Sequence, residues 1–457
     1  MHSVLRRSLW VVTLLAGCVV PPLEPGPPPV SEARDPGVRG GAAGAGAPLA
    51  SLTKAERAAF DAGLVDFADV EGVKDGLGPT MNLDSCAGCH LAPSLGGTSP
   101  PTNPQVAFAT KESATNTLPS FIRPDGPVRE VRFIRNTDGT PDGGVHALFT
   151  IAGRTDAPGC TLAQPDFGAE LARGNIIFRI PTPTFGTGLI EQIPDSAILA
   201  NLTQDRVEKR AMGIAGRPNI VLPFHTISGQ PNKNGNDGTL GRFGWKAQNK
   251  SLLVFAGEAY NVEMGITNEA FPTERDETVA CQFAPLPNSV HDLAAKTLLD
   301  GISSIEKFAL FMRFLAPPVP SNDTPGGAPS IERGRSAFRD AGCALCHTPT
   351  MTTGDSSVAA LRKQPVDLYS DLLVHDMGEG LADGVSQGQA GPREFRTAPL
   401  WGLGQRLFFL HDGRTADLRE AVRAHFSKGS EANGVIRKFY RLPAPQQQDV
   451  YNFLRSL

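Results

Sequence analysis

The stretch Cys86-Ala87-Gly88-Cys89-His90 recurs in the same pattern as Cys343-Ala344-Leu345-Cys346-His347. In each copy two thiols stand three positions apart and a histidine follows directly. On one helical turn, such thiols can add to the two vinyl groups of a porphyrin, and the histidine then gives the iron an imidazole ligand. This spacing is typical of c-type haem attachment. We therefore expect two covalent haem c groups, attached at Cys86, Cys89, Cys343 and Cys346, with His90 and His347 as iron ligands.

Two other interpretations of the cysteine pattern are open. A zinc site of four cysteines places its pairs roughly 15–20 residues apart, whereas 253 residues separate Cys89 from Cys343. A dithiol redox pair would not require a histidine after both copies. Haem attachment accounts for both features, so the sequence favours it.

The N-terminus has the features of an export signal. Two arginines precede the apolar residues 9–16 (LWVVTLLA). Leu15-Ala16-Gly17-Cys18 then resembles the bacterial lipoprotein cleavage box, and an ordinary cleaved signal peptide is the alternative. We expect residues 1–17 to be a signal peptide and Cys18 to carry a lipid anchor, which places the protein in the periplasm, where haem c is attached.

Residues 18–50 are predicted to be a disordered tether between the anchor and the folded chain. The segment contains the runs PPLEPGPPP and GGAAGAGAP, which lack the side chains needed for a core. Beyond it, two cysteines remain after Cys18 and the four haem cysteines are assigned. Cys160 and Cys281 are expected to form a disulfide in an oxidising compartment, and two buried free thiols are the alternative.

The composition limits the classes of function. The 457 residues carry a formal net charge of −4, so no basic excess indicates a partner nucleic acid. The 49 glycines and 39 prolines indicate a loop-rich protein. No run of 18 apolar residues is present, so membrane contact is expected through the lipid anchor only.

The pattern of apolar residues predicts a mainly α fold with two cytochrome c-like haem domains. Helices are expected from residue 53, where Thr53 and Glu56 form a capping box, and over 303–315, 330–340 and 445–457. We expect a first haem domain at 51–316, a linker at 317–329 and a second haem domain at 330–457. Residues 100–240, rich in Pro, Gly, Asn and Thr, are predicted to be a large insertion of loops and short strands such as 175–180.

The chain resembles bacterial di-haem cytochrome c peroxidases, and most closely a longer branch of di-haem oxidoreductases labelled thiol oxidoreductases. The resemblance rests on motifs that cover most of residues 51–457. These are 75–79 (DGLGP), 185–195 (FGTGLIEQIPD), 241–247 (GRFGWKA), 375–384 (HDMGEGLADG), 395–403 and 411–414 (HDGR). The region 100–240 matches the longer branch alone.

The resemblance implies roles for three further positions. Residues 262–265 (VEMG) match the segment whose glutamate lies over the peroxide-binding haem, which makes Glu263 a candidate acid–base group; a solvated loop carboxylate is the alternative. Trp245 lies where these enzymes place a tryptophan between the haems, and a core aromatic is the alternative. Residues 418–425 match the helix that supplies a distal methionine, but the ligand position holds His425.

The sequence does not decide which residues are the sixth iron ligands. For the second haem, His425 lies on the buried face of its predicted helix, and Met377 in a glycine-rich loop is the rival. For the first haem, His146, His225 and Met81 are candidates, and an open position would suit peroxide binding. Arg396 and Arg414 are candidates to pair with haem propionates, with surface ion pairing as the alternative.

The resemblance implies reduction of hydrogen peroxide at the N-terminal haem, with electrons relayed by the C-terminal haem. The electron donor would be a cytochrome c, a cupredoxin or the quinol pool. The shorter peroxidases often hold calcium between their domains, but this sequence shows no cluster of oxygen ligands for it. Two alternatives stay open, namely a di-haem electron carrier without peroxidase activity and an oxidoreductase acting on an organic or sulfur substrate.

Overall fold

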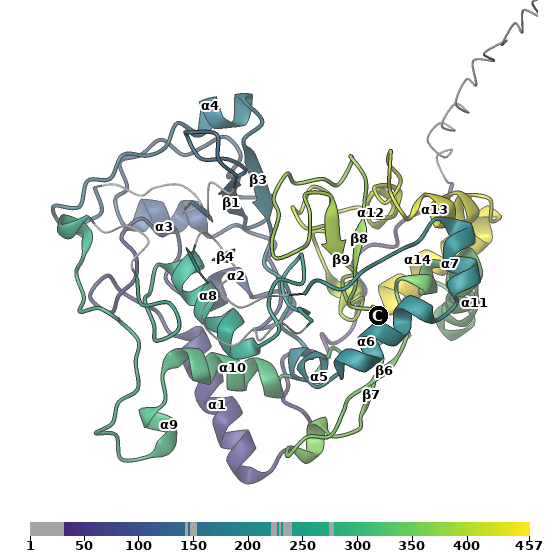
Figure 1. Cartoon of the computed structure of the whole chain (residues 1–457), viewed down its shortest axis with the longest axis horizontal. Helices are drawn as coiled ribbons and strands as arrows, with labels where there is room; N and C mark the ends of the chain where they lie inside the picture. The colour runs from purple at the N-terminus through teal and green to yellow at the C-terminus, as the bar shows by residue number, and fades with distance from the viewer. Residues whose placement is uncertain are drawn as a thin grey trace, which may run out of the picture.

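The computed structural model describes residues 32–141, 145–146, 153–220, 226–227, 230–231, 240–273 and 278–457. Within these residues it contains 14 α-helices and nine short strands, which confirms the mainly α prediction (Figure 1). The expected signal peptide and Cys18 lie outside the described residues. No helix of the described part is long and apolar enough to cross a membrane.

The N-terminal half is built around a pair of helices, α1 (Lys54–Ala68) and α10 (Ser304–Phe314), with α8 (Leu252–Met264) against α10. The capping box that begins α1 is present, with the side chains of Thr53 and Glu56 each accepting from the other's backbone. Gly63 lets the two helices approach closely, because a Cβ there would lie 2.2 Å from the Lys307 carbonyl oxygen. The ring of Phe311 packs at 4.8 Å from that of Phe67.

Residues 100–240 contain more helix than the sequence predicted. A three-stranded antiparallel sheet has the order β2-β1-β3, and the strand expected at 175–180 is confirmed as β3. Helices also lie in this region, because short apolar runs there find partners in the main core. The elements are α3 (Gln105–Lys111), β1 (Glu130–Phe133), β2 (Val145–His146), α4 (Phe167–Ala172), β3 (Ile176–Arg179), α5 (Thr187–Glu191), α6 (Asp195–Thr203), α7 (Arg206–Met212), β4 (Thr226–Ile227) and β5 (Gln230–Pro231).

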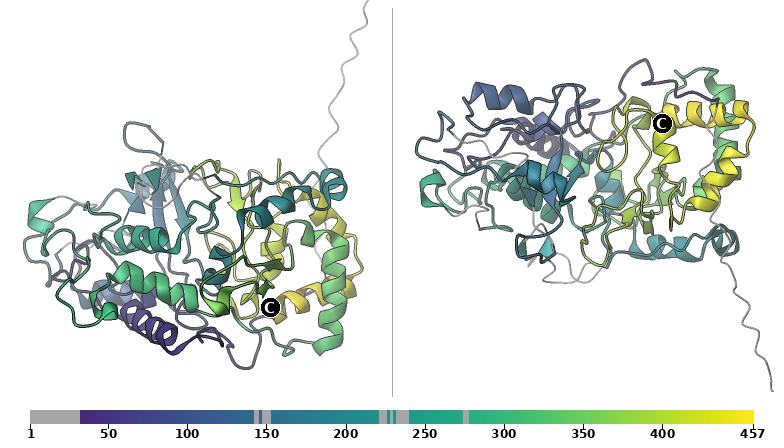
Figure 2. Two further views of the ribbon diagram at one scale, coloured as in Figure 1. Left: turned by 60° about the horizontal axis from the view of Figure 1, so that its bottom comes forward. Right: turned by 90° about the horizontal axis from the view of Figure 1, so that it is seen from above.

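The C-terminal half is closed by two long helices, α11 (Gly327–Ala341) and α14 (Ala444–Ser456), as the sequence predicted (Figure 2). The rings of Phe338 and Phe453 meet between them at 5.5 Å. The remaining elements are α9 (Leu298–Gly301), β6 (Met351–Thr352), β7 (Pro365–Val366), β8 (Val374–Asp376), β9 (Glu394–Arg396), α12 (Leu418–Arg423) and α13 (Asn433–Tyr440). Strands β6 and β7 pair with each other, and so do β8 and β9.

The largest hydrophobic core joins residues of both halves. It contains Phe60 and Phe311 from the N-terminal helices together with Leu361, Leu368 and Leu373 from the loops that follow the second cysteine motif. A second core is confined mainly to α11, α12, α13 and α14. The domain limits expected from the sequence remain a prediction, and the packing shows that the two halves share a core.

Residues 32–50 differ from the disordered tether that their composition predicted. Ala33 is buried in the second core, and the carboxylate of Asp35 forms a buried ion pair with Arg455 of α14 at 2.7 Å. Further along, Leu49 N–H donates to the Phe314 carbonyl at 2.8 Å. Backbone hydrogen bonds, side-chain hydrogen bonds such as that from Arg39 to the Val319 carbonyl, and one ion pair therefore fix a segment that has few apolar side chains.

A disulfide joins Cys160 to Cys281, as expected from the cysteine count. It links the region 100–240 to the segment that follows α8. Both sulfurs lie in a small core with Val73 and Ala157, next to the loop that leads to the first cysteine motif.

Candidate functional site

The second cysteine motif opens onto a large cavity, of about 1440 Å³ counted to its open mouth. Cys343, Cys346 and His347 line it. The other walls are mostly apolar and come from α11, α12, α13, α14 and the loops around β8 and β9. Helices α11 and α14 thus border a large void beside two thiols and an imidazole.

The histidines of both motifs are oriented in the same way. His347 Nδ1 donates to the Tyr369 carbonyl at 2.9 Å, and His90 Nδ1 donates to the Gly97 carbonyl at 2.9 Å. Burial lowers the pKa of each imidazole to about 4. A neutral ring that donates from Nδ1 leaves the Nε2 lone pair free, which is the arrangement found in histidines that bind metals.

Both candidate sixth ligands of the second site line the cavity. His425 follows α12, and its Nδ1 donates to the Ala421 carbonyl at 2.8 Å, so its Nε2 is also free. Met377 lies in the loop after β8 and lines the same cavity. The choice between His425 and Met377 stays a prediction, because both are present in the wall.

The two arginines expected at the propionates differ in position. Arg396 lines the cavity at the end of β9, whereas Arg414 is not among its lining residues and forms an ion pair with Asp412 at 2.6 Å. The structure adds Arg406 to the wall. Sequence reasoning missed Arg406 because nothing local distinguishes a buried arginine from an exposed one.

The first cysteine motif opens onto two adjoining cavities of about 760 and 750 Å³, each about half as large as the cavity at the second motif. Cys86, Cys89 and His90 line the first of them. The two cavities are neighbours, because four residues belong to both walls: Cys89, Thr182, Phe255 and Glu263.

Glu263 stands in the wall common to these two cavities, on the last turn of α8. Its side chain is accessible because it faces the void, and many protein atoms lie around that void. Burial, and to a lesser extent the charges of Glu130 and Glu258, raise the pKa of this carboxyl to about 8. A carboxyl with such a pKa can both accept and donate a proton near neutral pH.

Trp245 lies between the two sites. It lines the cavity of the second motif, one of the cavities beside the first motif, and a smaller void of about 530 Å³ between them. Its indole N–H donates to the Ile180 carbonyl at 3.0 Å, and the guanidinium of Arg406 lies 5.8 Å from its ring. Glu263 and Trp245 therefore both line cavities next to the cysteine motifs, and their roles in the reaction stay predictions.

The candidates for the sixth ligand of the first site are only partly described. Met81 is buried and lines the same cavity as Glu263 and Trp245. His225 lies outside the described residues, and for His146 the described part is the backbone of β2. The ligand at this position stays a prediction.

Comparison with known proteins identifies the family. The family model described as "Di-haem oxidoreductase, putative peroxidase" matches residues 131–457, which is more than half of the chain. The chain belongs to this family. The match begins after the first cysteine motif and includes the second. No curated protein matches the chain.

One solved structure is similar over a limited part of the chain. It is the hydrazine synthase of Kuenenia stuttgartiensis pressurised with xenon, with 17% sequence identity and a TM-score of 0.22. The match covers 35% of this chain and 58% of that one, less than two thirds of its length. A similarity of this size establishes neither the fold nor the function.

The two sites of this di-haem oxidoreductase fit a haem each. Both offer a paired thiol and a histidine with a free Nε2 beside a large void. At the second site, the buried guanidinium groups of Arg396 and Arg406 have nitrogens without a partner, which suits an anionic group in the cavity. These observations are independent of the family match and agree with it.

A cluster of ionisable groups beside the second motif is better explained by ion pairing than by a metal ion. Ligand atoms of Cys346, Asp371 and His375 lie within 4.8 Å of one another. Both ring nitrogens of His375 face carboxylates, at 2.9 Å from Asp371 and 2.8 Å from Glu431. Although burial opposes protonation, the charge of Asp371 and its hydrogen bond to the ring raise the pKa of His375 above its usual value. Both ring nitrogens of His375 are thus engaged by carboxylates, which leaves neither free to bind a metal.

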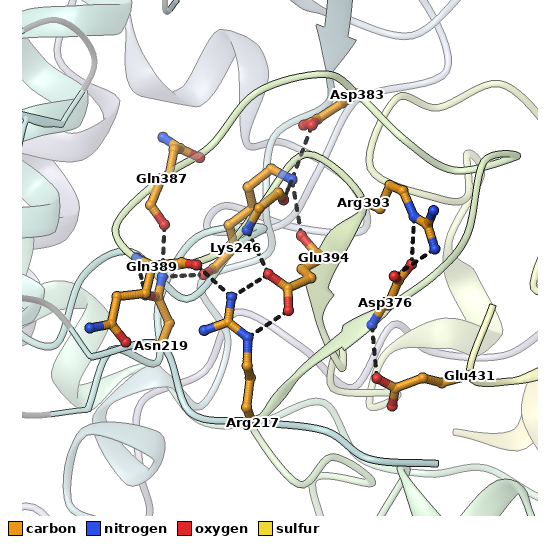
Figure 3. A network of polar contacts seen from close by, with 11 residues as sticks. Arg217, Asn219, Lys246, Asp376, Asp383, Gln387, Gln389, Arg393, Glu394 and Glu431 are labelled. Carbon is orange, nitrogen blue, oxygen red and sulfur yellow. Dashed lines mark hydrogen bonds and ion pairs between the residues drawn. The ribbon is translucent and has the colours of Figure 1, made fainter. Parts of the chain in front are cut away.

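A buried polar network fixes the segment that carries Arg396 (Figure 3). Lys246 follows Trp245, and its ammonium contacts the Asp383 carboxylate at 3.0 Å and donates to the backbone carbonyl of Glu394 at 2.9 Å. Arg217 pairs with the Glu394 carboxylate from the other side. The network therefore ties the tryptophan between the sites to the wall of the second cavity.

Proposed function

We propose that the chain is a periplasmic di-haem c-type oxidoreductase that reduces hydrogen peroxide. In this proposal one haem is attached at Cys86 and Cys89, the other at Cys343 and Cys346, and Cys18 carries the lipid anchor. The C-terminal haem receives electrons and relays them to the N-terminal haem. The family of di-haem oxidoreductases and the two cysteine motifs support the cofactor assignment.

The position of Glu263 carries the proposal. This carboxyl faces the void beside Cys89 and His90 and stands in the wall that the two cavities share. A haem iron bound there supplies the electrons that cleave an O–O bond. Glu263 then has the remaining task, which is to take a proton from the oxygen of peroxide near the iron and deliver it to the leaving oxygen. Its pKa of about 8 suits both transfers.

The place of Trp245 supports electron transfer between the sites. Its side chain lines the voids on both sides and is held by the hydrogen bond to Ile180. An aromatic ring in this position provides a short path for electrons between the two sites, through covalent bonds and van der Waals contacts. The donor to the second haem is proposed to be a small redox protein, either a cytochrome c or a cupredoxin, or the quinol pool.

The test compares Glu263→Gln with Glu332→Gln in protein produced with its haem attached. Glu332 lies on the exposed side of α11 and serves as the matched control. Haem content is measured by optical spectroscopy, and turnover as the peroxide-dependent oxidation of a reduced donor. We expect Glu263→Gln to lower kcat/KM by about 10²–10⁴-fold with both haems retained, while Glu332→Gln matches the wild type.

The pH profile adds a second criterion. The carboxylate form of Glu263 must accept the first proton, and this form grows as the pH rises through about 8. The wild-type rate should rise over this range, and the variant should lose the rise. Full activity of Glu263→Gln would remove this residue from the mechanism. Two six-coordinate haems that do not react with peroxide would favour the electron carrier, and turnover of an organic or sulfur compound instead would favour the third function.

A further inference from the structure

Among the described residues, two arginines with buried guanidinium nitrogens have no carboxylate partner in the wall between the sites. Arg396 and Arg406 line both the cavity of the second motif and the smaller void next to Trp245. Arg396 Nε donates to the Gly244 carbonyl at 3.0 Å, but its Nη1 has no partner. Arg406 Nε and Nη2 have none either. Burial lowers the pKa of each guanidinium to about 10.

Other buried arginines of the described chain show how this protein usually places such a charge. Arg179 pairs with Asp383, Arg242 with Asp195 and Arg455 with Asp35. A buried cation without a counter-charge costs several kcal/mol. Among the described residues the pair in the cavity wall has no such carboxylate, so an anion bound in the cavity would supply the missing counter-charge.

We propose that Arg396 and Arg406 form a clamp for the two propionates of the haem attached at Cys343 and Cys346, and that their charge sets the redox potential of this haem. This inference rests on the proposed function. Haem c carries its propionates on the edge opposite the vinyl groups, so a haem held by these cysteines would turn its carboxylates away from them, toward other parts of the cavity wall. The planar fork of a guanidinium matches a carboxylate with two parallel hydrogen bonds.

The backbone holds Arg406 in place for this task. Its carbonyl oxygen accepts from Arg455 Nη1 at 3.0 Å, and Arg455 is itself anchored by Asp35. On the other side, Arg396 is fixed by the pairing of β9 with β8 and by its N–H donating to the Trp245 carbonyl at 2.9 Å. Both guanidiniums are thus presented from rigid segments.

The clamp has a measurable electrostatic consequence. Reduction adds one negative charge to the iron site, and two nearby cations in a poorly hydrated cavity stabilise the reduced state. Removing one cation should lower the midpoint potential of the second haem. The potential of the first haem should change less, because its motif lines other cavities.

The experiment is a spectroelectrochemical titration of the full chain with both haems attached. Arg406→Gln and Arg396→Gln should each lower the midpoint of the second haem, and Arg406→Lys should recover part of the shift because it keeps the charge without the fork. Arg414→Gln is the matched control, since Arg414 pairs with Asp412 outside the cavity wall. It should leave the midpoint unchanged.

The outcomes separate the clamp from the proposed function. Two haems with a midpoint that moves no further in Arg406→Gln than in Arg414→Gln would overturn the clamp alone. The same holds if Arg406→Gln changes the KM for peroxide or for the donor but not the potential, because the arginine would then bind a substrate. A wild-type chain whose Cys343 peptide carries no haem would overturn the proposed function and the clamp together.

Discussion

The packing of residues 32–50 against the folded chain predicts that Asp35 stabilises the protein. The composition of this segment gives no reason to expect this. Arg455 Nε and Nη2 donate to the two carboxylate oxygens at 2.8 and 2.7 Å, and Leu418 N–H donates to Oδ2 at 2.8 Å. The side chains of Arg455 and Asp35 are 2% and 10% exposed. Asp35→Ala removes these three bonds and a fourth from Gly37 N–H to Oδ1 at 2.9 Å, and it leaves a buried guanidinium without its carboxylate.

The magnitude follows from the geometry. Removing one partner of a buried ion pair costs about 3–5 kcal/mol. We expect the low end, about 3 kcal/mol, because Arg455 Nη1 keeps the carbonyls of Leu403 and Arg406 as acceptors. Asp61→Ala is the control, since Asp61 forms an exposed pair with Arg57 and such a pair is worth about 0.5 kcal/mol.

The assay is urea unfolding of both variants and the wild type, followed by circular dichroism. Burial opposes ionisation of Asp35, but the hydrogen bonds of Arg455 and Leu418 hold its pKa below the usual value. The contribution of Asp35 to the free energy of unfolding is therefore fully present above a pH of about 4. It is lost as the pH falls through the lowered pKa of the folded state. A loss no larger in Asp35→Ala than in Asp61→Ala at pH 7 would refute the docked segment.

Two further predictions concern the second haem and the disulfide. His425→Ala should change the coordination state of the C-terminal haem in its optical and EPR spectra, whereas Met377→Leu should not; the opposite pattern would assign the methionine as the ligand. Replacing both Cys160 and Cys281 by serine should lower the free energy of unfolding by about 2–5 kcal/mol, because the bond closes a loop across a separation of 121 residues. An unchanged denaturation midpoint would show that the bond is not formed in the native protein.

Local patterns were sufficient for several elements. The sequence predicts the capping box at Thr53, the apolar faces of α11 and α14, and the strand at 176–179. These features depend on the spacing of apolar residues and on capping residues, which act over only a few positions. The helices within 100–240 were missed because they are short and depend on partners in the shared core. The docking of residues 32–50 was missed for a related reason, since its interactions are backbone bonds and one ion pair across more than 400 positions.

The sequence by itself determined two motifs whose chemistry suits haem attachment, because two thiols and a histidine at this spacing are a local property of five residues. It also supplied Glu263 and Trp245 through resemblance. Only the tertiary structure decided which arginine faces the cavity, since Arg406 and Arg414 look alike along the chain and differ in whether a carboxylate lies beside them. Burial and pairing arise when distant segments meet, so the electrostatics of the site belong to the fold.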